Sequence, residues 1–405
     1  MTDYHSSLLR LLDERGYIHQ ITDAAALDAR AADNRITGYI GFDATAPSLH
    51  VGNLVSIMML RRLQQAGHRP IVLMGGGTTK VGDPSGRDTT RTVMTDEKIA
   101  ENIASIRAVF ERFLDFDDAD TGAILVNNDD WLSKLEYIPF LRDIGQHFTI
   151  NRMLTFDSVK LRLDREQPLS FLEFNYMILQ GYDFLELYRR EDCVLQMGGS
   201  DQWGNIVNGM ELVRRVAGGQ AYGLTTPLIT TADGKKMGKT AAGAVWLNTA
   251  QLPDYDYWQF WRNTQDADVG RFLRIFTDLP LDEIARLETL EGAEINAAKI
   301  ELANAATTLC RGEAAAMSAA KAAAAAFAGG TDEDLPHVDI RGPVNIVDAL
   351  VAIGFASSKG EARRLVKGGG ARIDGEAVAE NHNITMSRET RISAGKKRHG
   401  LLRPI

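Results

Sequence analysis

The sequence is poor in cysteine, and its two cysteines, Cys193 and Cys310, lie far apart and match no zinc-ligand spacing. This scarcity excludes a disulfide framework and a metal site built on cysteine. The sequence also lacks an uncharged apolar stretch long enough to span a membrane, and its first ten residues lack the apolar core of a signal peptide. We therefore expect a cytoplasmic protein with no membrane segment.

Several common motifs are missing as well. The glycine-rich segment 75–86 has neither the G-x-x-x-x-G-K-S/T spacing of a P-loop nor the G-x-G-x-x-G spacing of a dinucleotide-binding loop. Residues 199–202 do not form the G-x-S-x-G elbow of a serine hydrolase. The glycines of segment 75–86 are better explained by tight turns and by close approach of the backbone to a ligand.

Positive charge is scarce in most of the chain and concentrated at its C-terminal end. Residues 341–405 contain 12 Lys and Arg against six Asp and Glu, a local balance of +6. Because the whole chain carries −9, the first 340 residues carry −15. A basic tail on an acidic body suggests contact with a polyanion, although a solvated basic surface would give the same balance.

Segments typical of strands and of helices alternate in the first 250 residues. Strands are expected at residues 36–42, 69–74, 123–127 and 194–197, and helices at residues 3–33, 54–63, 95–114, 169–187 (broken near Gly181) and from about 203 to 216. Such alternation implies right-handed crossovers between parallel strands. We therefore expect an α/β fold with a Rossmann-like parallel sheet in a catalytic domain at residues 1–245.

The remaining chain has a different pattern. With 405 residues, 44% of them hydrophobic, the chain is long enough for two or three domains. Only helices are expected between residues 255 and 327, and a linker at 331–340 then leads to a compact segment with helices at 345–353 and 357–367 and a strand at 371–373. We expect an α-helical domain at 246–330 and a small α+β domain at 341–405.

Polar residues gather where the expected strands end. Ligands in open α/β sheets bind beyond the carboxyl ends of the strands, so we expect Asp83 and Asn128 in the same crevice as Tyr39. Three polar residues of the helix at 169–187 share one helix face through their i, i+4, i+7 spacing: Tyr176, Gln180 and Asp183. This face either meets solvent or lines a pocket.

A loop with the features of a phosphate site joins the first strand to the next helix. It carries Thr45 and His50, and it ends where unpaired N–H groups and the positive end of the helix dipole converge. Its residues 50–53, His-Val-Gly-Asn, resemble the HIGH motif of class I aminoacyl-tRNA synthetases. Residues 236–240, Lys-Met-Gly-Lys-Thr, resemble the KMSKS loop of the same class, and the two lysines of such a loop can approach a triphosphate.

Together with the blocks at 82–86, 176–183 and 196–205, these motifs resemble the bacterial tyrosyl-tRNA synthetases from end to end. The resemblance assigns seven residues to tyrosine: Tyr39 and Asp183 on the phenol, Asp83, Tyr176 and Gln180 on the α-ammonium, and Asn128 and Gln196 beside them. It assigns six residues to ATP and the adenylate: Asp43, Gly52, Asn53, Gly198, Asp201 and Gln202. It assigns catalytic contacts with the phosphates to Thr45, His50, Lys236, Lys239 and Thr240.

The resemblance also implies the reaction. The family activates L-tyrosine with ATP to tyrosyl-adenylate, releasing diphosphate, and transfers tyrosine to the 3′ end of tRNA(Tyr), producing AMP. This chemistry needs positioning and cationic stabilisation but no covalent nucleophile. Magnesium would accompany ATP through phosphate oxygens and water, so we expect no protein metal site and no tightly bound cofactor. Similarity to the family further suggests a homodimer with tRNA lying across both subunits.

The two C-terminal segments would contact the tRNA. The resemblance makes residues 246–330 an anticodon-binding domain, and residues 341–405 are similar to the RNA-binding domain first named for the S-four ribosomal protein. A serine-capped helix in this last domain offers four cations to phosphates: Lys359, Arg363, Arg364 and Lys367.

Three residues depart from the family pattern. Asn53 replaces the second histidine of HIGH, and its amide can still donate to ribose or phosphate. Gly238 replaces the serine of KMSKS, which we expect to make the loop more mobile. Ile40 stands where related enzymes often have a cysteine that touches ribose, so we expect that contact to be absent.

Two alternative functions remain open. A tryptophanyl-type enzyme shares the sheet and both loops, but an indole has no phenol for Tyr39 and Asp183 to bind. A catalytically inactive paralogue could instead bind structured RNA through the basic tail.

Overall fold

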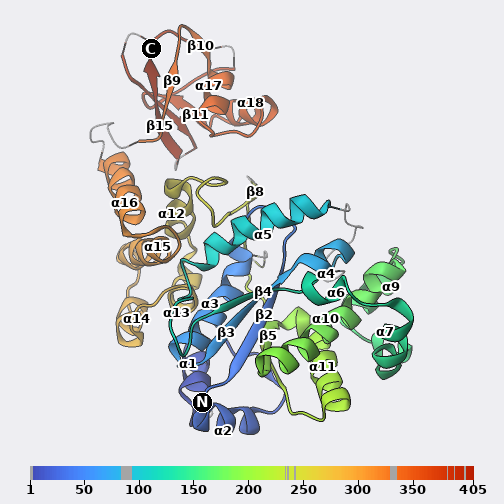
Figure 1. The fold of residues 1–405 in the computed structure, drawn as a ribbon. Helices are drawn as coiled ribbons and strands as arrows, with labels where there is room; N and C mark the ends of the chain where they lie inside the picture. Colours follow the sequence, from blue (N-terminus) through green and yellow to red (C-terminus); the bar gives the residue numbers. More distant parts are fainter. Residues whose placement is uncertain are drawn as a thin grey trace.

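The structure is a computed structural model. It describes residues 3–83, 94–232, 234, 237–240, 243–328, 335–380, 382–386, 388–395 and 398–405, without the side chains of residues 157, 158, 239, 240 and 326–328. Figure 1 shows an α/β body, a group of helices beside it, and a small α+β unit that follows the last of these helices. The three parts have the fold class expected from the sequence.

A six-stranded sheet forms the centre of the body, in the order β1-β6-β5-β2-β3-β4. All neighbouring strands are parallel except β1 and β6, which pair antiparallel at one edge. The strands are β1 (Gln20–Ile21), β2 (Thr37–Asp43), β3 (Arg69–Gly75), β4 (Ile124–Asn127), β5 (Cys193–Gly199) and β6 (Tyr222–Thr226). The predicted parallel sheet is therefore confirmed.

The order of the strands reverses at β2. The chain runs from β2 to β3 and β4 on one side, and then returns to place β5 and β6 on the other side. In open α/β sheets, ligands bind at such a reversal, beyond the carboxyl ends of the strands. The topology thus places a binding crevice at the ends of β2 and β5.

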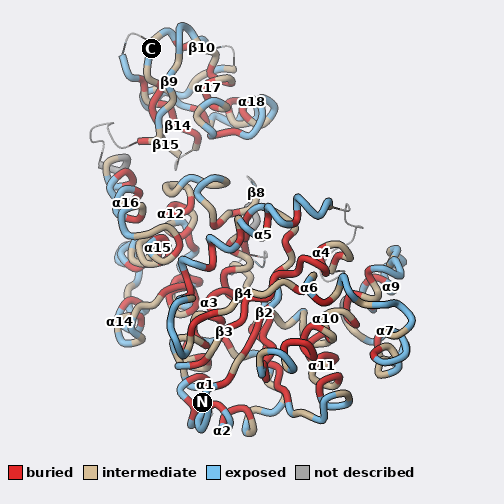
Figure 2. Tube along the Cα trace, in the orientation of Figure 1, coloured by how far each residue is buried: buried red, intermediate tan, exposed pale blue. Residues whose placement is uncertain are grey.

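Helices cover both faces of this sheet. On β3, Val72 and Met74 pack into one hydrophobic core, whereas Ile71 and Leu73 pack into a second core on the opposite face. Figure 2 shows buried residues along the strands, as this arrangement requires. The helices of the body are α1 (Ser7–Glu14), α2 (Ala24–Asp33), α3 (Val51–Gln65), α4 (Gly76–Val81), α5 (Asp96–Phe110), α6 (Asp129–Leu132), α7 (Tyr137–Asp143), α8 (Ile150–Met153), α9 (Asp157–Asp164), α10 (Phe171–Glu191) and α11 (Trp203–Leu212).

Three local predictions were wrong. The helix expected at residues 3–33 is divided into α1 and α2 by the short edge strand β1. Within the glycine-rich segment, residues Gly76–Val81 form the helix α4 instead of a series of turns, and residues 84–86 lie outside the described residues. The predicted break near Gly181 is absent, because α10 is continuous there and a Cβ at Gly181 would lie 3.6 Å from the backbone nitrogen of Gly209 in α11. Gly181 thus allows two helices to approach closely.

The helices after the sheet share its core. Trp258 and Trp261 of α12 pack in the same hydrophobic cluster as Leu8 of α1 and Leu60 of α3. The guanidinium of Arg15 donates to the carbonyl oxygens of Arg274, Thr277 and Leu279, which anchors the end of α13 to α1. The helices are α12 (Asp254–Arg262), α13 (Val269–Phe276), α14 (Leu281–Glu288), α15 (Ile295–Arg311) and α16 (Glu313–Ala328).

The C-terminal unit has a hydrophobic core of its own, formed by residues between 346 and 402. A five-stranded sheet, in the order β12-β11-β14-β15-β9, packs against two helices. Its elements are β9 (His337–Ile340), β10 (Val344–Asn345), α17 (Ile346–Ala352), α18 (Lys359–Lys367), β11 (Ala371–Ile373), β12 (Glu376–Ala377), β13 (Asn383–Ile384), β14 (Thr390–Ala394) and β15 (Arg398–Pro404). In the described part of the chain, no helix has both the length and the apolar composition that crossing a bilayer requires.

Candidate active site

Tyr39 lies in the middle of β2, beside Gln196 of β5 in the parallel register. Its side chain is buried, and its ring packs against that of Phe184 with 5.3 Å between the centroids. Burial and the negative charge of Asp183 raise the pKa of Tyr39 well above its usual value. Among the described residues, nothing hydrogen-bonds to its hydroxyl. A buried polar group without a partner costs about 1–3 kcal/mol, so this hydroxyl is suited to a ligand that supplies one.

Asp183 projects from α10 and is 1% exposed. Its two carboxylate oxygens accept hydrogen bonds from Asn128 Nδ2 at 2.9 Å and from Trp131 Nε1 at 2.7 Å. Burial raises the pKa of Asp183 to about 7, although these two hydrogen bonds oppose the shift. Trp131 was missed as a site residue, and the signal that could have identified it is an indole donor one turn beyond the end of β4.

A chain of hydrogen bonds leads from Asp183 towards the end of β2. Asn128 Nδ2 also donates to Thr78 Oγ1 at 3.0 Å, and Thr78 Oγ1 donates to Asp43 Oδ1 at 2.8 Å. The hydroxyl of Tyr176 donates to the other oxygen of Asp43 at 3.3 Å. Asp43, expected to face the adenylate, is therefore joined to residues expected to bind tyrosine.

A second polar group is centred on Gln202, just after β5. Its Oε1 accepts from Gln180 Nε2 at 3.3 Å and from Asn205 Nδ2 at 3.1 Å. Its Nε2 donates to Asp83 Oδ2 at 3.4 Å and to Asp201 Oδ2 at 3.5 Å. The structure thus brings together Asp83, Gln180, Asp201 and Gln202 from three separate segments of the chain.

Two side-chain carbonyl groups in this region lack a donor. The Oε1 atoms of Gln180 and Gln196 are buried without a hydrogen-bond partner in the described part of the chain. Gly198 permits the turn beside them, because a Cβ there would lie 3.2 Å from the Cβ of Gln202. The crevice therefore combines orphaned acceptors with the orphaned hydroxyl of Tyr39.

His50 is the N-cap of α3. Its Nδ1 accepts from the backbone N–H of Gly52 at 3.0 Å, so the neutral ring carries its proton on Nε2. Asn53 completes a capping box, since its Oδ1 accepts from the backbone N–H of His50 at 3.2 Å. The asparagine that replaces the second histidine of HIGH thus stabilises the start of the helix. Thr45 lies in the preceding loop and is partly exposed.

The KMSKS-like loop lies against this helix start. Gly238 has φ +99°, and a Cβ on it would lie 2.6 Å from the backbone nitrogen of Gly52. The carbonyl oxygen of Gly238 accepts from Val245 N at 3.1 Å, and Val245 O accepts from Val51 N at 2.9 Å. Glycine at position 238 therefore allows the two loops to touch. Close packing thus explains this glycine, whereas the expected explanation was a more mobile loop.

The KMSKS-like loop contains a short antiparallel pair of strands. Lys236 lies outside the described residues, and Lys239 and Thr240 form β7 (Lys239–Thr240), which pairs with β8 (Gly243–Ala244), without described side chains. Ile40 is buried in the core on the face of β2 opposite Tyr39. Within the part of the chain described, no three His, Cys, Asp or Glu side chains are grouped as metal ligands.

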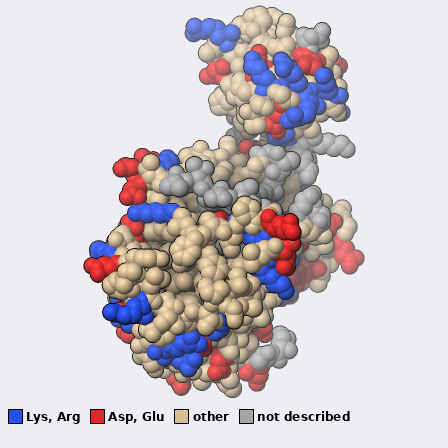
Figure 3. Space-filling model, turned by 90° about the vertical axis from the view of Figure 1, so that its right-hand side faces the viewer, with Lys and Arg blue, Asp and Glu red and all other residues tan. Residues whose placement is uncertain are grey.

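The predicted RNA-binding cations lie on α18, where Ser358 is the N-cap. Three of them form exposed ion pairs: Lys359 with Asp348 at 2.7 Å, and Arg363 and Lys367 with Glu380 at 3.1 and 3.6 Å. Figure 3 shows Lys and Arg side chains gathered on the C-terminal unit. Exposed pairs of this kind contribute little to stability, so a phosphate can compete for the cations.

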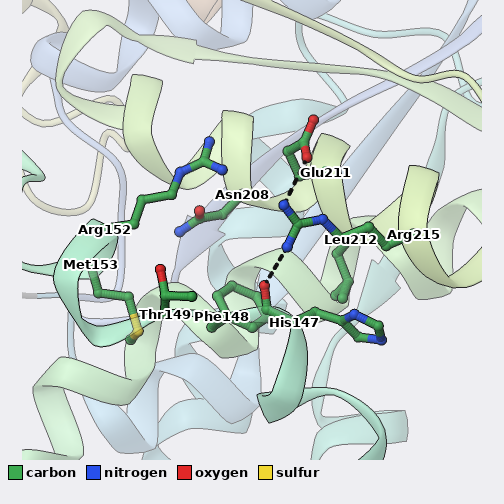
Figure 4. Close-up of a pocket in the computed structure, with 9 residues that line it drawn as sticks. All are labelled: His147, Phe148, Thr149, Arg152, Met153, Asn208, Glu211, Leu212 and Arg215. Carbon is green, nitrogen blue, oxygen red and sulfur yellow. Dashed lines mark hydrogen bonds and ion pairs between the residues drawn. The ribbon is translucent and has the colours of Figure 1, made fainter.

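A separate small pocket lies between residues 147–153 and the last turns of α11 (Figure 4). It has a volume of about 50 Å³, and in it Arg215 pairs with Glu211 at 3.2 Å and donates to the carbonyl oxygen of His147 at 2.7 Å. None of the predicted site residues lines this pocket.

Comparison with known proteins agrees with this geometry. Residues 31–328 match the family model for class I tRNA synthetases (W and Y), and residues 327–400 match the model for the C-terminal domain of SYY-like tyrosine--tRNA ligases. The tyrosine--tRNA ligase of Novosphingobium aromaticivorans is 68% identical, with all of both chains covered, and that of Zymomonas mobilis is 63% identical, with 99% of each covered.

A solved structure has the same fold. The C-terminally truncated mitochondrial tyrosyl-tRNA synthetase of Aspergillus nidulans superimposes with a TM-score of 0.70 at 30% identity, over 78% of this chain and 92% of that one. The chain therefore belongs to the class I tRNA synthetases, and within them to the tyrosine--tRNA ligase family.

Proposed function

We propose that this chain activates L-tyrosine with ATP to tyrosyl-adenylate and then transfers tyrosine to the 3′ end of tRNA(Tyr). Two observations carry the proposal: the hydroxyl of Tyr39 is buried and has no partner among the described residues, and the buried carboxyl of Asp183 is close enough to raise the pKa of Tyr39. A phenol hydroxyl matches both, because it can donate to the carboxylate and accept from Tyr39.

This recognition explains selection against the other aromatic amino acids. Phenylalanine would leave the buried hydroxyl of Tyr39 without a partner and would give Asp183 no donor beyond Asn128 and Trp131, so it would bind more weakly than tyrosine. Tryptophan would present an indole N–H, which can donate to Asp183 but cannot accept from Tyr39. The relatives of highest identity reported above are tyrosine--tRNA ligases, which also favours tyrosine.

The other end of the substrate would meet the polar groups near Gln202. An ammonium has donors and no acceptor, so it is suited to the carboxylate of Asp83 and the orphaned Oε1 of Gln180. We assign Tyr176 to the α-ammonium as well, and Gln196 to the wall of the tyrosine pocket. Asp201 and Gln202, with the backbone at Gly198, would hold the adenylate.

The reacting groups would meet at the start of α3. The carboxylate of tyrosine attacks the α-phosphorus of ATP in line, forming a P–O bond while the bond to diphosphate breaks. The Nε2 proton of His50 and the positive end of the α3 dipole would face the phosphates, together with Thr45. Lys236, Lys239 and Thr240 would approach from the adjacent loop. ATP would arrive as its magnesium complex.

The second half-reaction needs bound tRNA. The ribose hydroxyl at the 3′ end attacks the adenylate carbonyl, and AMP leaves. We propose that residues 246–330 bind the anticodon region, that 331–340 act as a linker, and that the basic unit at 341–405 contacts the RNA backbone through Lys359, Arg363, Arg364 and Lys367. Both cysteines are buried and free, which suits a reducing cytoplasm.

We also propose a homodimer. Large apolar side chains are exposed on consecutive helices from α7 to the start of α10, including Tyr137 at 61%, Ile138 at 68%, Ile150 at 59% and Phe171 at 68%. A soluble monomer rarely leaves so many apolar side chains exposed in one region. A second copy covering this region would remove them from water.

Replacing Asp183 by Asn should impair tyrosine recognition selectively. The variant keeps the shape and loses the charge-assisted bond to the phenol, so the KM for tyrosine in ATP–diphosphate exchange should rise about 10- to 100-fold while the KM for ATP stays unchanged.

In the unmodified enzyme the KM for tyrosine should also rise as the pH falls below about 7, where Asp183 becomes protonated, and Asp183→Asn should remove that dependence. Asp130→Asn, a change at an exposed carboxylate in α6, is the control. Equal changes in both KM values would contradict the assignment.

Replacing Gly238 by Ala should slow adenylate formation. The added Cβ would collide with Gly52 and strain a positive φ, so the loop must withdraw from the phosphates, and kcat should fall about 5- to 100-fold with the tyrosine KM unchanged. Gly234→Ala provides a matched control, because Gly234 also has a positive φ, +79°, but open space around it. If both substitutions have the same effect, contact between the loops is irrelevant.

Replacing both Ile138 and Phe171 by Asp should produce a monomer. Two charges in an apolar interface oppose its burial, so light scattering should give the mass of one 44.5 kDa chain, against twice that value for the unmodified protein. Met317→Asp, at a residue of α16 that is 66% exposed, should leave the mass unchanged. A monomeric unmodified protein would refute the proposal.

Removing residues 341–405 should separate the two half-reactions. The unit has its own hydrophobic core, so its loss leaves the catalytic core intact and ATP–diphosphate exchange unchanged. Charging of tRNA should weaken and lose part of its salt dependence, because phosphate contacts disappear. If the shortened chain charged tRNA as well as the full chain does, residues 341–405 would have a purpose other than tRNA binding.

A further inference from the structure

The last turns of α10 carry a charged group to which the reaction gives no role. Glu186 has only 8% of its side chain exposed. It forms one ion pair with Arg190 at 2.7 Å and another with Arg189 at 3.4 Å. Arg190 Nε also donates to Glu186 Oε2 at 2.8 Å. Arg190 is therefore held in one orientation by a hydrogen bond and an ion-pair contact to the same oxygen.

The guanidinium held in this way lies over an aromatic ring. Arg190 Cζ is 5.2 Å from the centre of the Trp131 ring, which is within the range of a cation–π interaction. The same ring donates its Nε1–H to Asp183 at 2.7 Å. Trp131 thus has the arginine against its ring and the buried carboxylate at its N–H.

We propose that Arg190, oriented by Glu186, is a positioning residue for tyrosine recognition, because it holds the Trp131 indole in the orientation that donates to Asp183. The inference rests on the proposed function of Asp183 as the acceptor of the substrate phenol. Arg190 touches no substrate and acts through Trp131 alone. It is half exposed, with 50% of its side chain accessible, so its loss does not open a cavity in the core.

The physical reason lies in how the indole is held. Trp131 is 5% exposed, lies in the short helix α6 and packs in the hydrophobic cluster that contains Tyr39. This apolar packing has no preferred direction for the N–H, whereas Arg190 over the ring favours one orientation of the indole. A rotation that weakens the bond from Nε1 removes one of the two donors on the buried carboxylate. Asp183 would then be free to turn away from the position in which it faces the hydroxyl of Tyr39 and the incoming phenol.

Arg189 offers a matched comparison. It is the neighbouring residue of the same helix, pairs with the same Glu186, and has 45% of its side chain exposed, close to the 50% of Arg190. Arg189 differs from Arg190 in one contact: the cation–π interaction with the Trp131 ring in the described structure is made by Arg190. Substituting either arginine removes an ion pair from Glu186, but only one substitution removes the support of Trp131.

The test compares Arg190→Met with Arg189→Met in ATP–diphosphate exchange. Methionine matches the unbranched stem of arginine as far as Nε and removes the charged guanidinium. Arg190→Met should raise the KM for tyrosine about two- to tenfold, with the KM for ATP and the melting temperature unchanged. Arg189→Met should change none of these quantities, and Arg190→Lys should give an intermediate tyrosine KM.

A double substitution tests the route through Trp131. In a Trp131→Phe chain, which has no N–H to orient, Arg190→Met should cause no further rise in the tyrosine KM. An unchanged tyrosine KM in Arg190→Met, an equal rise in both KM values, or full additivity with Trp131→Phe would each overturn the inference. Failure of the proposed function would be seen separately, as an absence of tyrosine-dependent exchange in the unmodified protein.

Discussion

A carboxyl buried as completely as that of Asp183 is tolerated only when donors satisfy both of its oxygens. Asn128 and Trp131 supply these donors from the turn after β4, whereas Asp183 belongs to α10, which covers the other side of the pocket. A strand end, a short helix and a long helix therefore meet at one side chain. The result is a buried carboxylate whose two donors come from a different part of the chain.

The sheet brings the remaining groups to the same place. Its order reverses at β2, so the carboxyl ends of β2 and β5 lie side by side. Asp43 is the last residue of β2, and Gln202 lies just after β5. Hydrogen bonds connect Asp43 with Tyr176 of α10, and Gln202 with Gln180 one turn further along the same helix. The polar face of α10 is therefore turned towards this end of the sheet, where Tyr176, Gln180 and Asp183 each take part in hydrogen bonds with other segments.

The two loops that resemble the class I motifs can meet because each has a glycine at the point of contact. Gly238 and Gly52 approach so closely that a side chain on the first would occupy the space of the second. Asn53, a departure from the family motif, has a local structural explanation in the capping box with His50. Such departures need not weaken a site, because a residue can lose one contact and keep the geometry of the helix start.

The sequence by itself determined four of the six strands of the main sheet, most helices and the parallel pairing, because hydrophobic periodicity and caps such as Ser358 are local signals. It did not reveal β1 and β6, the antiparallel pair at one edge of the sheet. The sequence also determined the family, because the two loops and the polar blocks resemble those of one enzyme class. Only the tertiary structure decided that α10 runs unbroken past Gly181, that Trp131 belongs to the site, and that Gly238 is a packing residue. Each of these depends on a neighbour distant in the sequence, namely Gly209, Asp183 and Gly52, and no local pattern records such a contact.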